Sequence, residues 1–207
     1  IGNVKQYETI YDFSGFPRPL YEMTYAAKGH QVLAQEIHQL FKENKIESAL
    51  DNDRGIDHGA WTVLKLMYPE CDIPVVTLSV DPKRDPRELY NIGKALAPLR
   101  EKGVLIIGSG NTVHNLRMLN WYEVDAPTDK WAAEFDDWIE KQLKEWNIDE
   151  LLQYEKKAPN VKKAVPRCEH FIPLIMVAGA ADGTKKAQPI HRSSQFGNLT
   201  YFPWRFD

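Results

Sequence analysis

The sequence predicts an α/β fold, in which residues 1–207 form a single domain with a mixed, largely parallel central sheet and helices on both faces. Two apolar runs, Ile73–Val80 and Val104–Ile107, have the composition of buried strands. Between them, the residues from Asp85 to Leu96 have the pattern of a helix. Parallel strands need a crossover connection of this kind, so we expect the two strands to be parallel. The absence of repeats or of a shift in composition favours one domain.

Helices are expected in six places, one of them short, at 147–154. Residues 31–42 carry a stripe of apolar side chains at helical spacing, and a second helix is expected at 62–68. A third begins at Asp85-Pro86, where a capping acceptor precedes a proline at the first helical position. A long amphipathic helix covers 128–146, and an apolar helix beginning near Pro173 ends around Gly179. Residues 199–202 are expected to form a closing strand.

Composition restricts the classes of partner. With 43% hydrophobic and 27% charged residues and a formal net charge of -3, the chain has no basic surface typical of nucleic-acid or anionic-membrane binding. No apolar run approaches the roughly 20 residues of a membrane span. Cys71 and Cys168 form no Cys-x-x-Cys pair, which fits a reducing, cytoplasmic location and offers no thiolate metal site. We therefore expect a small-molecule partner.

Three histidines lie at junctions between predicted elements. His114 follows the loop Gly108-Ser109-Gly110-Asn111 at the end of a predicted core strand, where open α/β sheets bind their ligands. His58 lies between two glycines at the start of a helix. His170 precedes a helix N-terminus, whose positive end disfavours imidazolium and so favours the neutral ring that binds metals. Their spacing is too wide for a local metal motif, and structural roles are the alternative, with Asp57 capping a helix beside an incidental His58.

Four sequence motifs carry a more specific signal. They are Asp12-Phe13-Ser14-Gly15-Phe16-Pro17, Asp57-His58-Gly59-Ala60-Trp61, Ser109-Gly110-Asn111 with Val113-His114-Asn115-Leu116, and Glu169-His170-Phe171-Ile172-Pro173-Leu174. In order and spacing, the chain resembles the DOPA-dioxygenase type of extradiol ring-cleavage enzymes, relatives of the class III protocatechuate dioxygenases. The resemblance extends over essentially the whole chain.

The resemblance implies a role for each histidine. His170 matches a metal ligand, and His114 matches the general base that takes a proton from a catechol hydroxyl, although in some zinc-bound members it is counted as a ligand. His58 matches a residue that hydrogen-bonds substrate or oxygen. Asn115, Trp61 and Phe16 are the expected substrate-binding residues. The implied metal is non-haem Fe(II), with Zn(II) as an alternative.

The expected function is therefore O2-dependent extradiol cleavage of a catechol such as DOPA. Two further metal-binding histidines of the family are expected upstream of Ile1, since no histidine here precedes His30. The chain begins without methionine, which fits a record that lacks an N-terminal segment. Two alternatives remain: a zinc-dependent hydrolase, and a non-catalytic member of the same fold that binds a ligand or partner. His191, in a polar tail, is expected to be a surface residue. The oligomeric state is not predicted.

Overall fold

The computed structural model describes all 207 residues and divides the chain into two compact units, Ile1–Ser79 and Val80–Asp207. Helices and strands both occur, in agreement with the predicted α/β class. None of the helices combines the length and the apolar composition needed to cross a lipid bilayer. The single domain over 1–207 stays a prediction.

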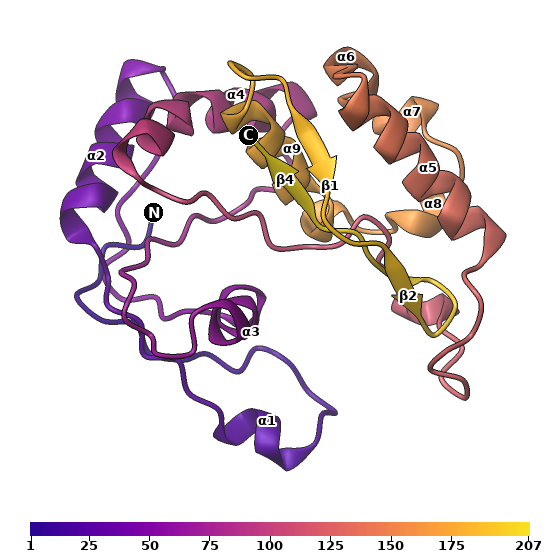
Figure 1. Cartoon of the computed structure of the whole chain (residues 1–207). Helices are drawn as coiled ribbons and strands as arrows, with labels where there is room; N and C mark the ends of the chain where they lie inside the picture. Colours follow the sequence, from indigo (N-terminus) through magenta and orange to yellow (C-terminus); the bar gives the residue numbers. More distant parts are fainter. The chain divides into compact units, whose positions relative to one another are not determined.

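Unit 1 combines extended segments with three helices, α1 (Arg18–Glu22), α2 (Gln31–Glu43) and α3 (His58–Met67), drawn in indigo to purple in Figure 1. Its core consists of Val4, Tyr7, Tyr25, Ala27, Ile56 and Trp61. Isolated parallel bridges join Gly2 to Asp51, Thr9 to Ile56 and Gly29 to Val75, and one antiparallel bridge joins Gln6 to Lys28. The predicted strand at 73–80 is thus an extended segment with a single bridge.

Unit 2 contains the remaining elements. Its helices are α4 (Pro86–Leu96), η1 (Ala97–Lys102), η2 (Leu116–Met118), α5 (Lys130–Lys144), α6 (Ile148–Leu151), α7 (Tyr154–Lys157), α8 (Val161–Ala164), η3 (Cys168–His170) and α9 (Ile172–Ala180). Its strands are β1 (Ala187–Pro189), β2 (Ser193–Gln195), β3 (Leu199–Tyr201) and β4 (Trp204–Phe206). They form two small antiparallel sheets, β1 with β4 and β2 with β3. The largely parallel central sheet is therefore not among the named strands.

Helices α4 and α9 pack against each other (Figure 1), and η3, which ends at His170, contacts α9. Helix α4 begins as the sequence predicts, because the Asp85 carboxylate accepts a hydrogen bond of 2.8 Å from the backbone N–H of Arg87. Glycines allow the close contact: a Cβ at Gly93 would overlap the Met176 carbonyl, and one at Gly179 would overlap the Tyr90 carbonyl. The two helix backbones therefore touch directly.

The segment Val104–Ile107 differs from its prediction as a buried strand. It is extended but belongs to no strand, and the side chains of Leu105 and Ile107 are 62% and 42% exposed. The following glycine, Gly108, lies against Pro173 and Val177 of α9. An apolar run is buried on both faces only when both faces are covered and its backbone is paired, and this segment has no strand neighbour.

Candidate functional site

Two of the three predicted histidines meet in unit 2. His114 comes from the irregular segment after Val104–Ile107, and His170 is the last residue of η3, directly before α9. Their rings stack, with centroids 3.7 Å apart and planes at 22°. Both residues are partly buried. The structure thus brings together two residues that are distant in the sequence.

Backbone hydrogen bonds hold the two segments that carry these rings. The Asn111 N–H donates to the His170 carbonyl at 2.9 Å, and the His114 N–H donates to the Ala164 carbonyl at 3.0 Å. Gly110 passes so close to the His170 backbone that a Cβ there would overlap its carbonyl oxygen. Gly110 is therefore needed for the contact that brings the loop against η3.

Burial and the neighbouring ring favour neutral His114. Desolvation is the larger cause and the charge of His170 the next, and together they lower the pKa of His114 below its ordinary 6.5, against the smaller opposing effect of a backbone hydrogen bond. At neutral pH the ring is therefore uncharged, with one nitrogen lone pair free to accept a proton or to bind a metal ion.

His58 lies in unit 1 and has a different partner. Its ring Nδ1 lies 2.7 Å from Oδ1 of Asp12, and its backbone N–H donates to the same oxygen at 3.1 Å. Burial acts to raise the pKa of Asp12, but the hydrogen bonds from His58 together outweigh it, so the pKa is lowered. An ionised carboxylate accepts only, so Nδ1 carries the hydrogen and neutral His58 presents Nε2 as an acceptor.

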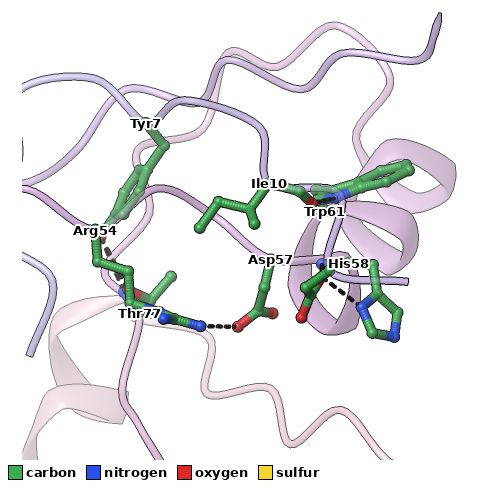
Figure 2. A network of polar contacts seen from close by, with 8 residues as sticks. Tyr7, Ile10, Arg54, Asp57, His58, Trp61 and Thr77 are labelled. Atoms are coloured by element: carbon green, nitrogen blue, oxygen red, sulfur yellow. Dashed lines mark hydrogen bonds and ion pairs between the residues drawn. The ribbon is translucent and has the colours of Figure 1, made fainter. Parts of the chain in front are cut away.

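Aromatic rings surround His58 within unit 1. Phe13 meets the His58 ring edge to face, at 5.5 Å between centroids, and also contacts Phe16, Tyr21 and Trp61. Trp61 is almost fully buried, and its indole N–H donates to the Ile10 carbonyl at 2.9 Å (Figure 2). Phe16 is 57% exposed. Of the predicted substrate-binding aromatics, Trp61 thus belongs to the core and Phe16 to the surface.

The Asp57 side chain does not cap α3. It precedes the helix in an extended conformation, but its carboxylate makes no capping hydrogen bond and instead pairs with Arg54 at 3.2 Å (Figure 2). The purely structural interpretation of this junction, a capping Asp57 with an incidental histidine, thus lacks its capping bond. Elsewhere in the same view, the Tyr7 hydroxyl accepts a hydrogen bond from the Thr77 N–H at 3.1 Å.

Two other predicted residues have internal or surface roles. The Asn115 side chain is buried, donating to the Lys163 carbonyl at 2.9 Å and accepting from the Arg117 N–H at 3.2 Å. His191 is exposed, and its Nε2 lies 2.7 Å from the Ser193 hydroxyl. Asn115 therefore supports the His114 loop, and His191 lies on the surface as expected.

A buried polar cluster behind the His114 loop was missed by the sequence analysis. Thr112, Asp136 and Thr200 are 6%, 1% and 1% exposed, and the Thr112 hydroxyl donates to Asp136 Oδ1 at 2.5 Å. The sequence did contain a signal. On α5, Asp136 shares the apolar face with Ala132, Phe135 and Ile139, and a carboxylate at a core position needs buried partners.

The side chains at this site are of a type that binds metal ions, but there are too few of them for a complete site. Neutral imidazoles are ligands for both Zn(II) and non-haem Fe(II), and His114 and His170 supply two of them. Sites of either kind use three protein ligands, and no group of three or more His, Cys, Asp or Glu side chains that could hold a metal converges in the structure.

Comparison with known proteins places the chain in a class. Its sequence matches, over residues 1–202, the LigB family, described as the catalytic LigB subunit of aromatic ring-opening dioxygenase. The chain therefore belongs to this family of class III extradiol ring-opening dioxygenases.

Particular relatives agree with the family match. The chain is 45% identical to the 4,5-DOPA dioxygenase extradiol of Beta vulgaris over 200 residues, which are 96% of this chain and 74% of the relative. It is 38% identical to the protein of that name from Escherichia coli K12, over 93% of this chain and 71% of the relative. A crystal structure of an uncharacterized protein from Escherichia coli K12 matches with a TM-score of 0.78 and 32% identity, over 97% of this chain and 78% of that one.

Proposed function

We propose that the protein uses O2 to open the ring of a catechol such as DOPA, beside its pair of hydroxyl groups, at a non-haem metal ion. The observation that carries the proposal is the stacked pair of His114 and His170, in a chain 45% identical to a 4,5-DOPA dioxygenase extradiol. No observation specifically favours a zinc-dependent hydrolase, which is therefore not proposed.

His114 would act as the general base. Its lowered pKa keeps the ring neutral, so that its free lone pair accepts the proton of a catechol hydroxyl. The backbone bond to Ala164 and the stacking on His170 hold the ring without a carboxylate partner. A positioned base of this kind contributes roughly 10²–10⁴-fold to a rate.

His170 would donate its imidazole to the metal ion, and in a Zn(II) form His114 would be a further ligand in place of its role as base. When bound, Fe(II), or Zn(II) as the alternative, would supply the positive charge and open coordination positions that such reactions need. The hydrogen bond from the Asn111 N–H to the His170 carbonyl holds the backbone of His170. This fixes the point, close to the start of α9, from which the His170 ring extends.

His58 would hydrogen-bond the substrate or oxygen. Asp12 fixes the hydrogen on Nδ1, so the neutral ring accepts a hydrogen bond from a substrate hydroxyl at Nε2, whereas a bond to oxygen requires the protonated ring, which donates at Nε2. The exposed ring of Phe16 suits stacking on an aromatic substrate. Trp61 and Asn115 would contribute through shape and support, since their N–H groups already donate to Ile10 and Lys163. A cytoplasmic location is also proposed, supported by two free cysteines.

The test uses protein expressed from its complete gene, loaded anaerobically with Fe(II) and then given DOPA and air. We expect O2 uptake and a yellow semialdehyde product. His114→Ala should lower kcat at least a hundredfold, and His170→Ala should lower the bound metal measured by elemental analysis. His191→Ala is the matched control, because that imidazole is exposed. Tight DOPA binding without O2 uptake would instead favour a non-catalytic binding protein.

A further inference from the structure

The cluster of Asp136, Thr112 and Thr200 joins three parts of unit 2. Asp136 comes from α5, Thr200 from β3, and Thr112 from the irregular segment two residues before His114. The Thr112 hydroxyl lies 2.5 Å from the Asp136 carboxylate and 3.1 Å from the Thr200 hydroxyl. Thr112 thus connects the buried carboxylate of α5 to the hydroxyl of β3.

The hydrogen count gives these contacts a direction. Each threonine hydroxyl has one hydrogen, and an ionised carboxylate has only acceptors. Thr112 therefore donates its one hydrogen to Asp136, so Thr200 is the donor and the Thr112 oxygen the acceptor in the contact between the two hydroxyls. Because hydrogen bonds to a charged acceptor are the stronger kind, the carboxylate fixes the Thr112 side chain more firmly than a second hydroxyl would.

The position of Thr112 connects this cluster to the His114–His170 pair. Between Thr112 and His114 lies only Val113, which is fully buried. The backbone around it is anchored on η3 through Asn111 and on α8 through His114, but it belongs to no helix or strand. A change at Thr112 is therefore transmitted over two residues to the His114 ring, because no regular hydrogen-bond ladder absorbs it.

The cluster has a cost that packing alone does not explain. Burial raises the pKa of Asp136 to about 6, although the hydroxyls and the nearby charge of Arg192 act against this and Asp137 adds slightly to it. Apolar side chains of similar volume would fill the same space without a buried charge, and buried ionic groups are often no more stable than such replacements. Apolar replacements would not fix the direction of the Thr112 side chain, whereas the Asp136 carboxylate does so through its hydrogen bond.

We propose that Asp136 is a positioning residue that acts through the Thr112 hydroxyl to hold the His114 ring against His170. Its relevance to catalysis rests on the proposed function, whereas the positioning itself does not. Asp136 touches neither ring. It would act through Thr112 on the fraction of molecules in which the His114 and His170 rings are stacked.

The test compares Thr112→Val with Thr112→Ser in the full chain. The valine variant keeps the shape and removes the hydroxyl, and the serine variant keeps the hydroxyl. The readout is the set of imidazole C–H signals in NMR spectra at pH 7.5, which the six histidines produce without metal or substrate. We expect the His114 and His170 signals, assigned from alanine variants, to shift or broaden in Thr112→Val. They should remain at wild-type positions in Thr112→Ser, and His30 and His38 should remain in both.

Neighbouring carboxylates provide a second comparison. Asp136→Asn should move the His114 and His170 signals, whereas Asp137→Asn, whose side chain is 66% exposed, should not. If Thr112→Val does not fold, Thr200→Val removes the hydroxyl that hydrogen-bonds Thr112 without altering the loop. Unmoved His114 and His170 signals in a folded Thr112→Val, or failing that in Thr200→Val, overturn the proposal, as do equal shifts in Asp136→Asn and Asp137→Asn.

Activity separates this inference from the proposed function. In an active enzyme, Thr112→Val should lower kcat at least tenfold with a KM change below twofold, and Thr112→Ser should restore the wild-type kcat. Shifted signals in a protein that cleaves no catechol would contradict the proposed function and leave the positioning intact. An active enzyme whose signals and kcat are both unchanged by Thr112→Val would contradict the positioning alone.

Discussion

The histidines of the two units are held in opposite ways. His58, in unit 1, pairs with a carboxylate at a half-exposed position, with 43% of its side chain and 39% of that of Asp12 accessible. His114 and His170, in unit 2, stack on each other, and backbone amides anchor the segments that carry them. A carboxylate selects which ring nitrogen carries the hydrogen, whereas burial beside a second imidazole selects the neutral ring. The comparison predicts that packing determines how His114 and His170 are held in unit 2, and that a charged partner determines how His58 is held in unit 1.

The largest effect is expected from Gly110→Ala. The added Cβ would overlap the His170 carbonyl, so the loop or η3 has to move. We expect a loss of about 3 kcal/mol in the free energy of unfolding, at the upper end of the cost of overpacking, measured by urea denaturation. The His114 and His170 ring signals in NMR spectra should change with it.

Gly183→Ala is the matched control for that variant. No heavy atom lies within 4 Å of a Cβ built there, and its φ lies outside the left-handed region. Its unfolding free energy should stay within about 0.5 kcal/mol of wild type. Equal effects of the two substitutions would show that the contact between Gly110 and His170 is not what stabilises the site.

An effect of similar size, but spread over a range of pH, is expected from Asp136→Asn. Because folding raises the pKa of Asp136 from 3.8 to about 6, the native state binds more protons than the unfolded state between these values. The contribution of this group to stability is therefore full below pH 4 and falls as pH rises to 6, by about 1.4 kcal/mol per unit and about 3 kcal/mol in all.

Urea denaturation from pH 4 to 7 tests this sign. The difference in unfolding free energy between wild type and Asp136→Asn should change by about 3 kcal/mol across the window, with wild type relatively more stable at the acid end. Asp137→Asn should show no such slope. A constant difference between wild type and Asp136→Asn would contradict the raised pKa.

The smallest effect on stability is expected from Asp12→Asn. The contact with His58 is half exposed, and even charged pairs at such positions contribute less than about 1 kcal/mol to the free energy of unfolding. Activity should respond more, since the amide no longer fixes the His58 tautomer, and we expect kcat/KM for DOPA to fall roughly tenfold. Asp57→Asn, which breaks the exposed pair with Arg54, should leave kcat/KM unchanged. Equal losses in both variants would remove the role assigned to Asp12.

Helices were predictable because their signals are local. The apolar stripe of α2, the cap and proline that begin α4, and the proline in the first turn of α9 all lie within a few residues of the feature they determine. Strands depend on partners elsewhere in the chain. The β-branched runs at 73–80 and 104–107 indicate an extended backbone, but composition does not say whether another strand pairs with it.

The site was predictable only in part, for a similar reason. Loop glycines beside His114 and a helix start beside His170 are visible in the sequence, and the structure brings these two residues together. Thr112, Asp136 and Thr200 come from separate elements, so only their burial reveals the cluster. Asp136 alone left a trace, as a charge on the apolar face of α5.

The direct contact between α4 and α9 limits how the region around His170 can move. Where side chains separate two helices, a change of rotamer lets one slide over the other. Gly93 and Gly179 leave only main-chain atoms at the crossing, so no such adjustment is available. If the start of α9 is displaced, α4 must therefore move with it as one rigid unit. Slow local motions of the region around His170 are costly in free energy for this reason.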